Sequence, residues 1–200
     1  MLAEVSEYLA NIRVKEVFFM KKNWSVKMLV EGGLCIALSF VLGYIKLFSM
    51  PQGGSVTAGE MIPIIIFALR HGSLQGIVVG AVYGFIQLLF GGSVYHPIQA
   101  LLDYPVAFGV LGLAGIFASQ FEKTRSIKPV FYGTFLGIAL RMLAHTLTGA
   151  IFFASYAPEG QNPWMYSIIY NASYLAVEFV ITVIIIYLLR NVITKDLQRI

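Results

Sequence analysis

The stretch IQALLDYPVAFGVLGLAGIFAS, residues 98–119, is almost entirely apolar and contains one charged residue, Asp103. It has the length that an α-helix needs to cross the hydrocarbon core of a bilayer, and Pro105 within it predicts a local kink. Only 12% of the chain is charged, whereas 58% is hydrophobic. This composition excludes an ordinary soluble domain and predicts an integral membrane protein.

Further apolar runs lie on both sides of this stretch, separated by glycine, proline and charged residues. None of them alternates between apolar and polar residues, so a helical bundle is favoured over a β-barrel. We therefore predict an all-α membrane domain over residues 27–192, with six transmembrane helices. In chain order the spans are about Met28–Phe48, Val56–Leu69, Leu74–Phe90, Ile98–Ser119, Val130–Ala154 and Trp164–Leu189.

The basic residues predict the orientation of this bundle. Because an even number of spans places both termini on one side, the segments between spans fall into two sets. All Lys and Arg residues except Lys46 and Arg141 belong to the set that contains the termini. The positive-inside rule makes this set cytoplasmic, so the net charge of +4 reflects topology and not nucleic-acid binding. Residues 1–26 are then a cytoplasmic extension or an interfacial segment, and residues 193–200 a cytoplasmic tail.

Polar side chains gather in the outer half of the predicted bundle. Asp103 and Tyr104 lie near the outer end of the fourth span, His145 lies in the fifth, and Asn171 lies near the start of the sixth. A buried carboxylate costs several kcal/mol unless it is paired or neutralised. His145 and Arg141 are both possible partners for Asp103, although Arg141 can also extend toward the cytoplasmic surface.

Aromatic residues are also frequent in this outer half, where they are typical of an interfacial belt or of a binding site. A carboxylate, an imidazole, an amide and aromatic faces together suit a flat ligand with a positive charge and hydrogen-bonding edges. At the opposite end of the bundle, Gly33 and Ala37 are four residues apart in the first span. This small-xxx-small pattern predicts a face that another helix can approach closely.

Five motifs, in order and with similar spacing, resemble the thiamin-specific S-component of energy-coupling-factor vitamin transporters. They are SMPQGGSV (49–56), HPIQALLDYPVAF (96–108), RMLAHTLTGAIFF (141–153), SYAPEG (155–160) and WMYSIIYNASY (164–174). The resemblance implies a six-helix S-component bundle in the bacterial plasma membrane that binds thiamin from outside, with no cofactor and no catalysis. It also implies that uptake requires a transmembrane scaffold subunit and two cytoplasmic ATPase subunits.

The resemblance further implies roles for individual residues. It assigns ligand contacts to Asp103, Tyr104, His145, Phe153, Tyr166 and Asn171, and more loosely to Tyr95 and the backbone of Gly54. Asp103 occupies a position where the family has glutamate, so its carboxylate reaches one methylene less far. Gly33 and Ala37 occupy the family's contact with the scaffold subunit.

Three other functions remain open at this point. The first is an S-component for another vitamin, because the shared bundle says little about the ligand. The second is an intramembrane enzyme that uses Asp103 and His145 as an acid–base pair, although no nucleophile motif and no metal-ligand spacing accompany them. The third is a small channel, but the outer loops lack the charged rings of an ion-selective pore.

Overall fold

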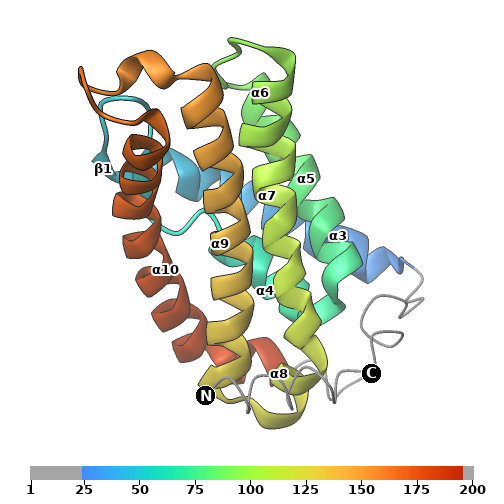
Figure 1. Cartoon of the computed structure of the whole chain (residues 1–200). Coiled ribbons are helices and arrows are strands. Elements are labelled where there is room, and N and C mark those ends of the chain that lie inside the picture. Colours follow the sequence, from blue (N-terminus) through green and yellow to red (C-terminus); the bar gives the residue numbers. More distant parts are fainter. Residues whose placement is uncertain (1–23, 196–200) are drawn as a thin grey trace.

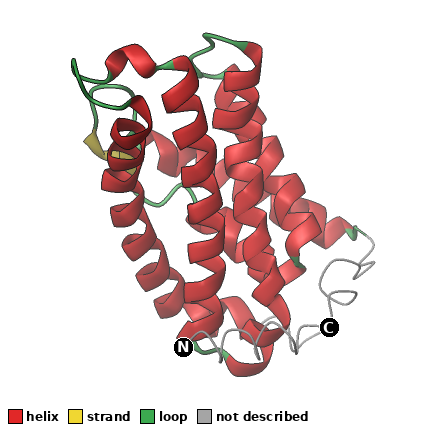
Figure 2. Ribbon diagram, viewed as in Figure 1, coloured by secondary structure: helices red, strands yellow, loops and turns green. Residues whose placement is uncertain are grey.

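A computed structural model describes residues 24–195 of the chain. Most of this part is helical, and the helices form a bundle whose longer loops gather at one end (Figures 1 and 2). The predicted amino-terminal segment lies mostly outside the described residues. In chain order the elements are α3 (Val26–Tyr44), β1 (Lys46–Ser49), β2 (Ser55–Thr57), α4 (Ile62–His71), α5 (Ser73–Leu89), α6 (Pro97–Leu101), η1 (Leu102–Val106), α7 (Ala107–Gly109), η2 (Val110–Phe117), α8 (Ala118–Thr124), α9 (Ile127–Phe152), η3 (Ala154–Tyr156) and α10 (Pro163–Lys195).

Four helical segments are long and apolar enough to cross a membrane: α3, the continuous segment Pro97–Thr124, α9 and α10. The helices α4 and α5 are apolar but shorter. The short α4 is central in the bundle, since Ile64, Ile65 and Ala68 are completely buried in the main apolar core. The prediction of a helical, multi-pass membrane protein is therefore confirmed.

The chain between α3 and α4 differs from the prediction. The predicted ends of the first two spans, Phe48 and Val56, both lie in strands, because β1 and β2 pair as a short antiparallel hairpin. Gly53 makes the turn possible with a φ of 91°, a left-handed conformation that favours glycine. The all-α description is thus wrong at this hairpin, whose residues pair with each other (Figure 2).

The helix that contains Asp103 is irregular at that point. Residues Leu102–Val106 form a π-type turn, which includes Asp103 and Pro105. Proline has no backbone N–H to donate, and a wide turn accommodates the missing hydrogen bond. The irregularity predicted at Pro105 therefore takes the form of a π-type turn.

Glycines of α5 bring two backbones into contact beside this turn. A Cβ atom added to Gly84 would lie 2.4 Å from the carbonyl oxygen of Tyr104, and one added to Gly80 would lie 2.3 Å from that of Phe108. Because real Cβ atoms do not approach so closely, α5 can pack here only through glycine. This contact sets the position of the helical turn that carries Asp103.

Candidate functional site

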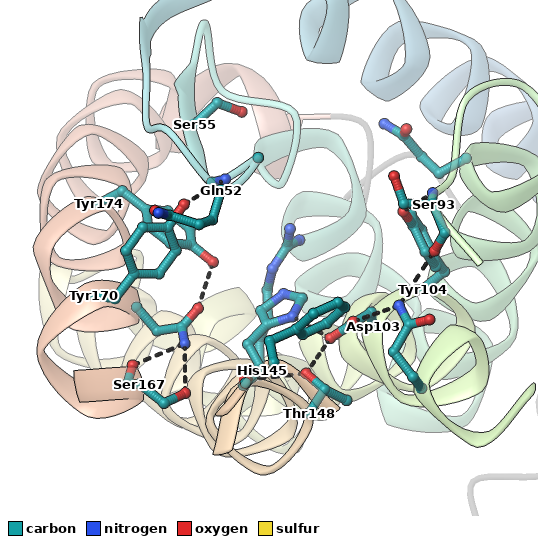
Figure 3. Close-up of a pocket in the computed structure, with 18 of the residues that line it drawn as sticks. Gln52, Ser55, Ser93, Asp103, Tyr104, His145, Thr148, Ser167, Tyr170 and Tyr174 are labelled. Carbon is teal, nitrogen blue, oxygen red and sulfur yellow. Dashed lines mark hydrogen bonds and ion pairs between the residues drawn. The ribbon is translucent and has the colours of Figure 1, made fainter. Parts of the chain in front are cut away.

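A cavity of about 560 Å³ occupies the loop-rich end of the bundle. All of the residues that the sequence predicts as ligand contacts line it: Gly54, Tyr95, Asp103, Tyr104, His145, Phe153, Tyr166 and Asn171. They come from the hairpin, the loop after α5, the helix Pro97–Thr124, α9 with the residue after it, and α10. Figure 3 shows Asp103 and Tyr104 facing Tyr170 and Tyr174 across this space.

The carboxylate of Asp103 is held by three side chains. His145 Nδ1 lies 2.9 Å from Asp103 Oδ1, which also accepts a hydrogen bond from the Thr148 hydroxyl. Gln99 Nε2 donates to Asp103 Oδ2 over 2.8 Å. Of the two partners proposed for Asp103, His145 is therefore the one found. Gln99 and Thr148 were not identified from sequence, although Gln99 is one helical turn before Asp103 and Thr148 is one turn after His145.

The contact with Asp103 determines which ring nitrogen of His145 carries the hydrogen. A carboxylate only accepts hydrogen bonds, so Nδ1 carries the hydrogen that lies between the two groups. In the neutral ring Nε2 is then an acceptor, and it is buried without a hydrogen-bond partner among the described residues. Nε2 is therefore an acceptor without a partner in the described part of the chain, and it is covered by neighbouring atoms.

Several aromatic rings line the cavity. The rings of Tyr95 and Phe153 meet edge to face with centroids 5.1 Å apart, and Tyr156 stacks on Phe153 at 5.8 Å. Tyr166 and Tyr170, which also line the cavity, stack on each other at 6.1 Å. Rings that line a cavity can stack on a flat aromatic ligand and attract a cation to their faces.

Both polar groups of the Asn171 side chain form hydrogen bonds within α10. Its amide Nδ2 donates to the carbonyl oxygen of Ser167 over 2.9 Å, and its Oδ1 accepts from the Tyr174 hydroxyl over 2.8 Å. One lone pair of Oδ1 remains for a ligand. Asn171 therefore presents an oriented acceptor, and not the donor–acceptor edge that an unbonded amide would offer.

A second charged pair lies deeper in the cavity wall. Arg141 Nη2 donates to Glu60 Oε1 over 3.2 Å, and the guanidinium carbon lies 3.9 Å above the centre of the Phe108 ring. Arg141 is only 7% exposed, so the alternative in which it extends to the cytoplasmic surface is wrong. Glu60 was not identified from sequence, although the predicted second span, about Val56–Leu69, contains it.

Glu178 joins the hairpin to α10. Its Oε1 accepts hydrogen bonds from both the backbone N–H and the hydroxyl of Thr57. Farther along the hairpin, the backbone N–H of Gly54 donates to the Tyr170 hydroxyl over 2.9 Å. The hairpin is thereby attached to α10 at two points beside the cavity. The criterion that singled out Asp103, a carboxylate inside an apolar run, applies equally to Glu178.

The predicted partner-binding pair lies outside this site. Gly33 and Ala37 are both exposed on α3, and a Cβ added to Gly33 would meet nothing within 4 Å. Among the described residues, no group of three His, Cys, Asp or Glu side chains is placed to hold a metal ion.

Comparisons with known proteins all indicate the same family, and the matches cover most of the chain. A family model described as "Thiamine transporter protein" matches residues 29–198. The thiamine transporter ThiT of Bacillus subtilis (strain 168) is 38% identical over 180 residues, which cover 85% of this chain and 93% of the relative. ThiT of Lacticaseibacillus paracasei is 30% identical over 188 residues, covering 86% and 91%. The solved structure of ThiT from Listeria monocytogenes shares the fold, with a TM-score of 0.76 at 24% identity, over 84% of this chain and 94% of that one.

Proposed function

Because this chain belongs to the thiamine transporter protein family, we propose that it captures thiamin in the cavity around Asp103 and carries it into the cell. The members matched here are named as transporters and not as enzymes. An acid–base reaction at Asp103 and His145 is therefore not proposed.

The observation that carries the proposal is the charge of the cavity. Of the buried charged groups in its lining, Glu60 and Arg141 pair with each other and cancel. Asp103 is left, with a histidine that can donate its hydrogen bond while neutral. Lys46 also lines the cavity, but it is exposed, where water screens its charge. The buried part of the cavity thus holds one unbalanced negative charge for a ligand with one positive charge.

Thiamin matches this arrangement chemically. Its thiazolium ring carries a permanent positive charge, and its aminopyrimidine ring has both donor and acceptor edges. Asp103 supplies the opposite charge, and Asn171 Oδ1 is an acceptor for the amino group. Two flat rings fit between aromatic side chains such as Phe153 and Tyr166. Asp103, whose side chain is one methylene shorter than that of glutamate, lies in a π-type turn.

The same proposal extends to the membrane arrangement and the partners. The four long apolar helices together with α4 and α5 would make a six-span S-component bundle, with both termini in the cytoplasm. Energy would come from a transmembrane scaffold subunit and two cytoplasmic ATPase subunits, and the chain itself contains no Walker motif. Gly33 and Ala37 are proposed as the scaffold contact, because they are small, exposed and lie on one face of α3.

Isothermal titration calorimetry of the detergent-purified protein with thiamin tests the proposal. Calorimetry is preferred to tryptophan fluorescence, because Trp24 and Trp164, the two tryptophans of the chain, lie outside the cavity lining. We expect tight binding with one thiamin per chain, and none with riboflavin, biotin or pantothenate. Absence of thiamin binding would refute the proposal, and preferential binding of one of the other three would identify an S-component for a different vitamin.

A further inference from the structure

An apolar groove of about 610 Å³ runs between α9 and α10, separate from the ligand cavity. Its lining residues recur every three or four positions on both helices, so the groove follows the helix axes. Its lining includes alanines at positions 139, 172 and 176, and the larger rings of Phe131, Phe135 and Phe179 border one end. Figure 1 shows α9 and α10 side by side along most of their length.

The groove faces the surroundings of the bundle. Both of its helices are long enough to cross a membrane, and Phe135 and Leu143 in its lining are more than half exposed. The surroundings of such helices are acyl chains, and an unfilled groove would forfeit the dispersion contacts of its walls. Phe131 and Thr146 mark its extent on α9 and are about 22 Å apart along the helix. That length exceeds one leaflet of hydrocarbon, which is about 15 Å.

The end of the groove bordered by the phenylalanines carries a positive charge. Lys128 is exposed and lies three residues before Phe131 and seven before Phe135, so it belongs to the same face of α9. It lies in the first turn of α9, which contains no acidic residue. The amino-terminal end of a helix favours anions, because its first N–H groups have no partners within the helix.

We propose that this groove binds an anionic phospholipid, with its phosphate at Lys128 and one acyl chain between α9 and α10. The groove supplies the contact for the chain, and the lysine with the helix terminus supplies the selectivity for charge. A lipid in this position packs against the two helices that carry His145 and Asn171, on the side away from the cavity.

Native mass spectrometry of the full chain in neutral detergent tests the proposal, with dioleoyl phosphatidylglycerol and dioleoyl phosphatidylcholine as probes. These lipids have the same acyl chains and differ in net charge. We expect tighter binding of the anionic lipid. Lys128→Gln should weaken that binding roughly fivefold, the equivalent of about 1 kcal/mol for one basic residue near a lipid headgroup. Its binding of the zwitterionic lipid should not change.

Two further variants separate the parts of the site. Lys123→Gln removes another exposed lysine, from α8, and should bind both lipids as the parent does. Ala176→Phe fills the groove and should lose both lipids, with Ala172→Leu as a second filling variant if the first does not fold. Elution as a single species and an unchanged circular dichroism spectrum identify folded variants. Equal binding of the two lipids by the parent, equal losses in the two lysine variants, or retention of lipid by the folded groove-filling variants would each overturn the proposal.

Discussion

Replacement of Asp103 by asparagine is the most direct test of the ligand cavity. Asparagine keeps one carbonyl oxygen, which can still accept from His145 and Thr148, but its NH₂ group then faces the Gln99 amide. A flip of the Gln99 side-chain amide would break two other hydrogen bonds. Its Oε1 accepts from the Tyr95 N–H over 3.0 Å, and its Nε2 donates to the Ser93 carbonyl over 3.2 Å. Two donors therefore meet, and the negative charge is lost.

The expected loss of affinity comes from the interaction between Asp103 and the thiazolium, because the bonds of Asp103 to Gln99, His145 and Thr148 are made without the ligand as well. An interaction with a charged group contributes about 1.5–3 kcal/mol, and its loss corresponds to a roughly 10- to 150-fold weaker affinity for thiamin. Calorimetric titration of the Asp103→Asn variant with thiamin measures the effect directly.

Two control variants define the result that would refute this reasoning. Tyr170→Phe removes one neutral hydrogen bond, from the Gly54 N–H, and should weaken binding about tenfold at most. Asp103→Glu keeps the charge, so it should bind thiamin more tightly than Asp103→Asn. If Asp103→Asn binds as well as Tyr170→Phe, or if Asp103→Glu binds as weakly as Asp103→Asn, the anion is not at Asp103.

Three other substitutions test separate parts of the molecule. Gly33→Trp should abolish uptake in cells but leave thiamin binding intact, since a Cβ atom at this position would meet nothing within 4 Å; loss of both would indicate a folding role. Glu60→Gln should destabilise the protein by about 3 kcal/mol, because it leaves Arg141 buried without its counter-charge, and an unchanged thermal midpoint in detergent would contradict this. Gly149→Ala should weaken thiamin binding, because the new Cβ would lie 2.2 Å from Ser167 Oγ, and Ser167→Ala in the same chain should partly restore it; additive losses would argue against this clash.

Local sequence patterns predict much of the fold because a membrane simplifies the problem. Apolar runs that are long enough to cross a bilayer form helices, since every backbone polar group must be satisfied within the segment. The helical membrane class and the family resemblance follow from such patterns, and the comparisons confirm both. The ends of the first two spans were predicted wrongly, because hydrophobicity does not distinguish a helix end from the paired strands at Lys46–Ser49 and Ser55–Thr57.

The sequence likewise predicts one part of the candidate site and leaves another part undecided. Asp103 could be selected from the sequence alone, since a carboxylate in an apolar run costs too much free energy to be incidental. Its partners could not be selected, because His145 and Arg141 are both within reach of it in any helical model of the fifth span. The structure pairs Arg141 with Glu60, which lies in the first part of the predicted second span and was not considered as its partner.

Composition and hydrophobic pattern therefore determine that this chain enters a membrane as helices and that Asp103 requires a partner. These properties depend on the transfer of single residues and segments out of water, which local sequence specifies. Only the packing of α5 and α9 against the helix of Asp103 decides that the carboxylate meets His145 and Thr148 beside a cavity. That outcome depends on contacts between separate helices, such as the contact of Gly84 with the backbone of Tyr104. The sequence of neither segment alone predicts such a contact.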